Sequence, residues 1–129
     1  MIEEIRVKLF TLEEANDLLP TLKQLLEKSD RARAALTTLA PYAREAAARA
    51  TEGGGTTAGS EYALYLVSFF ETVREINSHG IEVKDFERWL CDFPHMRDGR
   101  VVFLCWQRGE DSIQWWHDVE AGFAGRQPL

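Results

Sequence analysis

The residues that could carry chemistry are concentrated near the end of the chain. All four tryptophans, all three histidines and both cysteines lie between His79 and His117. If their segments are neighbouring strands, Cys105, His117 and Asp118 could bring a thiolate, an imidazole and a carboxylate together. Cysteine and histidine are preferred zinc ligands, and three protein ligands leave one coordination position open. This pattern indicates a candidate site for a divalent metal or a small ligand, with further candidate ligands in Asp92, His95 and Cys91.

The spacing of these residues favours a structural interpretation. The sequence contains no Cys-x-x-Cys, His-x-x-x-His or His-Glu-x-x-His motif that would arrange ligands locally. Cys105 is then a small buried hydrophobe, and His117 bonds to Asp118 or to a backbone carbonyl. A Cys–His nucleophile and base would need a helix N-terminus or cations to activate the thiol, and a strand around Cys105 supplies neither. We assign no catalytic residue.

Aromatic side chains are the second feature of this region. They can fill the core of a small sheet, or they can line a pocket or anchor a protein interface. Trp115 and Trp116 are adjacent, so in a strand they point to opposite faces. Both faces of the expected hairpin are apolar, whereas two helices cover only one face. The second face needs the tail or another copy, which predicts a homodimer. The interface candidates are Trp89, Trp106, Trp115, Trp116 and Phe123.

The C-terminal run Gly122-Phe-Ala-Gly-Arg-Gln-Pro-Leu129 is the third feature. Arg126 can form bidentate pairs with a carboxylate, so it could be delivered to an anionic ligand. The favoured interpretation is a structural strap in which Phe123 enters the core and Arg126 pairs with an acid. The candidate partners of Arg126 are Asp85, Asp92 and Asp118.

Helices are expected to fill most of the chain before this region. The alternation around Ile5–Leu9 predicts a short strand within residues 1–10. Thr11-Leu-Glu-Glu14 matches a capping box, and apolar residues at three- and four-residue steps then predict a long helix of nearly coiled-coil spacing. Pro20 should kink this helix, and a break near Pro41 is left open.

A second helix should complete a hairpin over residues 11–80. Gly53–Gly59 predicts the turn, and helices joined by a short glycine loop pack antiparallel. Ser60 is expected to cap the second helix and Gly80 to end it.

Residues 81–129 are expected to form a small antiparallel sheet and a C-terminal strap. Strand-like patterns cover Phe86–Phe93, Val101–Gln107 and Ile113–His117. A three-residue loop, Arg97-Asp-Gly99, is preferred and sets Cys91 opposite Cys105. A two-residue Asp-Gly loop would instead set Asp92 against Cys105. We therefore expect one α+β domain over residues 1–129, with a long helical hairpin and a β-hairpin or three-stranded sheet.

Composition excludes several classes of function. A net charge of −6 argues against nucleic-acid binding, which needs clustered Lys and Arg. No apolar run reaches the length of about 20 residues that spans a bilayer. The acidic start lacks the pattern of a secretory signal, and two cysteines without such a signal indicate free thiols in the cytoplasm.

A series of short motifs resembles a known family. The first is Phe10-Thr-Leu-Glu-Glu-Ala-Asn16 with Leu18-Leu-Pro20. The others are Val83-Lys-Asp85, Asp92-Phe-Pro94, Arg97-Asp-Gly99, Leu104-Cys-Trp106, Gly109-Glu110, Trp116-His-Asp118 and the run Gly122–Pro128. In this order they resemble small bacterial proteins grouped as domain of unknown function 2203. The resemblance implies a largely helical protein with a small β element, and it implies no activity.

Two functions follow from these features. The favoured one is a non-enzymatic, homo-oligomeric interaction or binding module. The alternative is a metal- or small-ligand-binding protein with a site around Cys105, His117 and Asp118.

Overall fold

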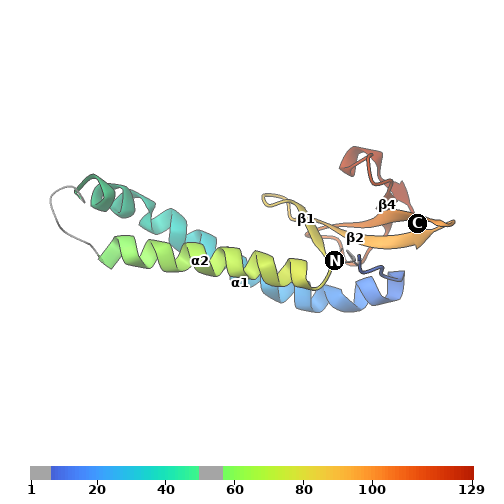
Figure 1. The fold of residues 1–129 in the computed structure, drawn as a ribbon, viewed down its shortest axis with the longest axis horizontal. Coiled ribbons are helices and arrows are strands. Elements are labelled where there is room, and N and C mark those ends of the chain that lie inside the picture. The colour runs from blue at the N-terminus through green and yellow to red at the C-terminus, as the bar shows by residue number, and fades with distance from the viewer. Residues whose placement is uncertain (1–6, 50–56) are drawn as a thin grey trace, which may run out of the picture. The chain divides into compact units, whose positions relative to one another are not determined.

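The computed structural model describes residues 7–49 and 57–129, which form two helices followed by an antiparallel sheet (Figure 1). The expected α+β class is confirmed. The helices are α1 (Leu12–Arg49) and α2 (Thr57–Ser78). The strands are β1 (Glu82–Asp85), β2 (Leu90–Arg97), β3 (Arg100–Gln107), β4 (Trp115–His117) and β5 (Gln127–Pro128), with a 3₁₀ turn at Phe123–Gly125.

The described residues fall into two compact units. Residues 7–22 and 76–129 make up the sheet unit, which includes the first turns of α1 and the end of α2. Residues 23–49 and 57–75 make up the helical unit. In the helical unit α2 runs alongside α1, and the Arg33 guanidinium lies 5.8 Å from the centre of the Phe69 ring.

The start of α1 is fixed by the predicted capping box. The Thr11 amide donates to the Glu14 carboxylate at 3.0 Å, and the Glu14 amide donates to the Thr11 hydroxyl at 3.1 Å. These bonds also lower the pKa of Glu14. The helix then continues through Pro20 and Pro41, so the break considered near Pro41 is absent from α1.

Two other predictions about helix ends have different outcomes. Ser60 lies inside α2, which begins at Thr57, so the predicted cap is wrong. Gly80 ends the helix as predicted, with a φ of 92° and an amide that donates to the Asn77 carbonyl at 2.9 Å. Of the predicted turn at Gly53–Gly59, residues 53–56 lie outside the described residues, and residues 57–59 belong to α2.

The predicted N-terminal strand falls partly outside the described residues. Residues 7–10 are not in a strand. Instead, the Phe10 amide donates to the Pro94 carbonyl at 2.7 Å, and the Phe10 and Phe93 rings pack edge to face with centres 5.3 Å apart. The backbone bond and the ring contact hold Phe10 against β2.

The β2–β3 hairpin has the two-residue turn rather than the preferred three-residue loop. Asp98 and Gly99 have φ angles of 51° and 79°, as a type I′ turn requires at both central positions. Arg97 therefore pairs with Arg100, and Asp92 lies opposite Cys105. The preferred register, with Cys91 opposite Cys105, is wrong, because the two-residue turn matches the right-handed twist of the strands.

The sheet is larger than predicted. Its five strands are antiparallel and follow the order β1-β2-β3-β4-β5. β1 was not predicted, and the predicted strand start at Phe86–Trp89 is a turn. Within this turn the Asp85 carboxylate accepts bonds from the amides of Glu87 and Arg88 at 2.8 and 2.9 Å.

Both faces of the hairpin are buried within this chain. Leu90–Pro94 and Val102–Trp106 are buried throughout. The face that carries Phe93 lies against Phe10 and the first turns of α1, where Asn16 accepts a bond from the Ile113 amide at 2.8 Å. The opposite face is covered by the tail after His117. The hairpin therefore gives no support to the predicted homodimer.

Candidate metal-binding site

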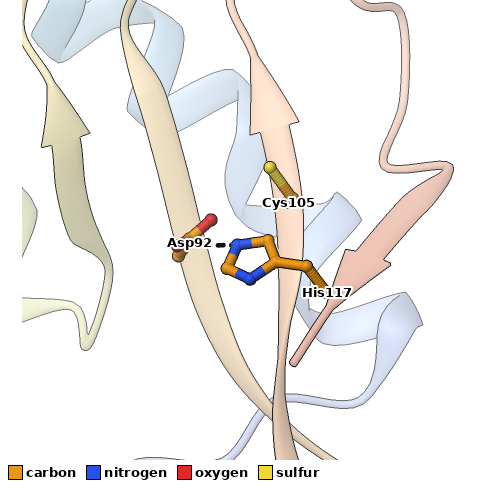
Figure 2. A group of neighbouring side chains, drawn as sticks. All are labelled: Asp92, Cys105 and His117. Atoms are coloured by element: carbon orange, nitrogen blue, oxygen red, sulfur yellow. Dashed lines mark hydrogen bonds and ion pairs between the residues drawn. The ribbon is translucent and has the colours of Figure 1, made fainter. Parts of the chain in front are cut away.

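Three neighbouring strands each contribute one ligand-type side chain to the tail-covered face of the sheet (Figure 2). Asp92 on β2 pairs with Cys105 on β3, and His117 lies on β4 opposite Phe103. Because residues two apart in a strand share a face, all three side chains point the same way. A carboxylate oxygen, the thiol sulfur and a ring nitrogen lie within 4.8 Å of one another, and all three residues are buried.

Hydrogen bonds fix the orientation of the His117 ring. Its Nδ1 lies 2.7 Å from the backbone carbonyl oxygen of Asp118, which can only accept, so Nδ1 carries a proton and donates it. Its Nε2 lies 3.0 Å from Oδ2 of Asp92. One proton must lie in this second contact, since two bare lone pairs would repel each other. The ring is thus held as metal-bound histidines are, with one nitrogen anchored on a backbone carbonyl.

Burial makes charge at this site costly. It raises the pKa of Asp92, an effect that the contact with His117 partly offsets. Burial, with the neighbouring Asp92 carboxylate, also raises the pKa of the Cys105 thiol to about 11. The other oxygen of Asp92, Oδ1, is buried without a hydrogen-bond partner among the described residues. Such an orphaned oxygen is expensive unless something compensates it, and a cation would do so.

A cavity of about 200 Å³ adjoins the three side chains. Its wall includes the apolar side chains of Leu90, Val119 and Phe123, and the charged side chains of Lys84 and Glu120. The cavity is large enough for a water molecule or a small ligand. The buried cluster can therefore be reached from one side.

Several predicted ligand candidates lie away from the cluster. The Asp118 carboxylate pairs with Arg100 at 2.9 Å, so this residue contributes only its backbone carbonyl to the site. Cys91 lies on the opposite face of β2, where burial raises its thiol pKa to about 12. His95 is also on that face, and its Nδ1 lies 2.7 Å from the Phe10 carbonyl.

Arg126 serves the strap that covers the site. Its guanidinium bonds to the Glu110 carboxylate at 2.6 Å and to the Cys105 carbonyl at 3.2 Å. It also stacks between the rings of Trp115 and Phe123, at 5.3 and 4.7 Å from their centres. None of the three acids predicted as its partner forms this pair; the partner is Glu110. The strap thereby ties the tail to the strand that carries Cys105.

The aromatic interface candidates divide between the core and the strap. Trp89, Trp106 and Trp116 are buried, and the Trp106 indole donates to the Glu110 carbonyl at 2.9 Å. Trp115 and Phe123 are half-buried beside Arg126. Trp115 and Trp116 point to opposite faces, as their adjacency predicts.

Comparison with known proteins places the chain in a family. A family model described as "Uncharacterized conserved protein (DUF2203)" matches residues 8–129. The chain belongs to this family. The DUF2203 match spans every residue of the candidate site and the whole strap. No curated protein and no solved structure matches the chain. In the described part of the chain, neither helix is long and apolar enough to cross a membrane.

Proposed function

We propose that this protein binds one divalent metal ion of the zinc class through Asp92, Cys105 and His117. The observation that carries the proposal is the convergence of three ligand types in one buried cluster whose histidine is already oriented by a backbone carbonyl. Ligand atoms of a tetrahedral zinc site lie about 2.0–2.3 Å from the metal. Side-chain movements of about 1 Å would bring the three donor atoms to such distances.

The ligand set favours zinc over harder ions. A thiolate sulfur is a soft ligand, whereas Mg²⁺ and Ca²⁺ prefer oxygen ligands. Together, the carboxylate of Asp92 and the thiolate of Cys105 balance the charge of a divalent ion, so the loaded site is neutral and suits a buried position.

The metal would keep one exchangeable position. Three protein ligands with an adjoining cavity match the pattern of zinc sites that bind water or a substrate, whereas structural zinc sites are closed by four protein ligands. The ion would supply a Lewis-acidic centre at this cavity.

The test is zinc binding by protein prepared without a histidine tag. Calorimetric titration of the metal-depleted chain should show one zinc ion per chain. Cys105→Ala, Asp92→Asn and His117→Ala should each weaken binding by more than about 100-fold, because altering even the partners that support metal ligands costs about 10–100-fold.

The matched control is Cys91→Ala, which removes a buried thiol from the other face of the same hairpin. It should bind zinc as the wild type does. The proposal fails if the wild-type chain does not bind zinc, or if Cys91→Ala weakens binding as much as Cys105→Ala. Either result would leave the three residues as a buried polar cluster that only stabilises the sheet.

A further inference from the structure

The outer side of α2 exposes an unusual density of large apolar side chains. Leu64, Val67 and Phe70 are 69%, 52% and 61% exposed, and Leu66, which lies beside Phe70 on the helix surface, is also exposed. Scattered apolar residues on a surface are normal, but a contiguous patch of this kind marks an interaction surface. The patch lies within the helical unit and is independent of the metal site.

The patch is the side of α2 that does not pack on α1. Thr72 is fully buried, and helical geometry places Val67 on the opposite side of α2. Among the described residues of the helical unit, few are buried: Leu25, Leu26, Ser29, Ala32 and Thr72. Two packed helices bury only the strip of side chains along which they touch, whereas four helices in a bundle enclose a core between them. A second pair of helices would therefore bury what this pair leaves exposed.

We propose that this patch binds a second copy of the chain, with the two α2 helices packed against each other across a two-fold axis near Val67. Val67 is the centre of the patch, because Leu64 and Phe70 lie about one turn before and after it on the same side of α2.

The exposed area agrees with a symmetric pair. The four apolar side chains expose on the order of 450 Å² per copy, so two copies would bury about 900 Å² from these residues alone, and the exposed residues that flank them would bring the total to the lower end of specific interfaces. In a dimer with two-fold symmetry both copies contribute the same surface patch, and this is the commonest arrangement of homo-oligomers.

The experiment is sedimentation equilibrium of the 129-residue chain over a range of concentrations. The wild type should have twice the mass of one chain. Val67→Glu places two like charges face to face at the centre of the interface, and it should raise the dissociation constant by at least about 100-fold. Val101→Glu makes the same change at an exposed valine of the sheet unit, and it should leave the dimer intact.

A wild-type chain that is monomeric at all concentrations would overturn the proposal. A dimer that survives Val67→Glu would overturn it as well, since another surface would then hold the two copies together.

Discussion

His117 holds its ring with one nitrogen on a backbone carbonyl and the other on a buried carboxylate. The bond from Nδ1 to the Asp118 carbonyl leaves Nε2 as the atom available to a metal. Nε2 and Asp92 share one proton at 3.0 Å, and the Cys105 thiol keeps its own proton because its pKa is raised to about 11. A metal would therefore replace the proton between Asp92 and His117 and the thiol proton of Cys105.

This proton inventory gives a quantitative prediction. Zinc binding at neutral pH should release about two protons, one from the Cys105 thiol and one from the Asp92–His117 contact. Since protons compete with the metal, the affinity should fall as pH falls, by about 100-fold per pH unit near neutrality. Calorimetric titration in buffers of different ionisation enthalpy measures the number released. Release of no protons would show that zinc binds somewhere other than these three residues.

At the scale of elements, the register of one hairpin decides whether the site exists. The strand patterns around Cys91 and Cys105 were recognisable in the sequence, and so were the capping box and Gly80. The choice between a two- and a three-residue turn depends on whether Asp98 adopts a positive φ, which the sequence leaves open. A one-residue slip exchanges the two faces of a strand, so this choice puts Asp92 rather than Cys91 beside Cys105.

Other elements were missed because their signals are local and short. β1 and β5 are edge strands of 4 and 2 residues, too short for an alternation pattern to appear. The partner of Arg126 was missed because Glu110 lies outside every predicted strand, in the loop that follows β3. Asp92 was identified as a candidate ligand. Its position between Cys105 and His117 depends on the pairing of three strands, which the sequence alone does not reveal.

The strap should support both the stability and the metal affinity of the sheet unit. Arg126→Met keeps an apolar side chain between the rings but removes the bonds to Glu110 and to the Cys105 carbonyl. Because these charged bonds are largely buried, we expect a loss of about 2 kcal/mol in unfolding free energy and about 10-fold in zinc affinity. Urea denaturation and zinc titration measure the two effects.

The control for the strap is Arg100→Met. Arg100 pairs with Asp118 at the surface, where ion pairs contribute little, so this change should alter stability by less than about 1 kcal/mol. Equal effects of the two substitutions would show that the strap does not depend on the buried bonds of Arg126.

The second half of α1 contains a residue that should weaken it. Pro41 has no amide proton, so the carbonyl of Thr37 lacks its helical partner, although α1 continues past this point. Pro41 is exposed, and Pro41→Ala should stabilise the protein by about 1–3 kcal/mol, as helix propensity predicts. Urea denaturation and circular dichroism measure the change. A loss of stability would show that Pro41 is accommodated by contacts that alanine cannot make.

At the scale of the molecule, the two proposals belong to different units. The metal site and its strap lie in the sheet unit, and the apolar patch lies in the helical unit. Variants at Val67 should therefore leave zinc binding unchanged, and variants at Cys105 should leave self-association unchanged, because the two sites have no residue in common and changes at independent sites are usually additive.

The most direct measurement is anomalous X-ray diffraction at the zinc absorption edge, from crystals of the protein grown with zinc. The account predicts one strong peak at about 2.0–2.3 Å from Oδ of Asp92, Sγ of Cys105 and Nε2 of His117. A zinc peak elsewhere, with the bond from His117 to Asp92 still intact, would contradict it.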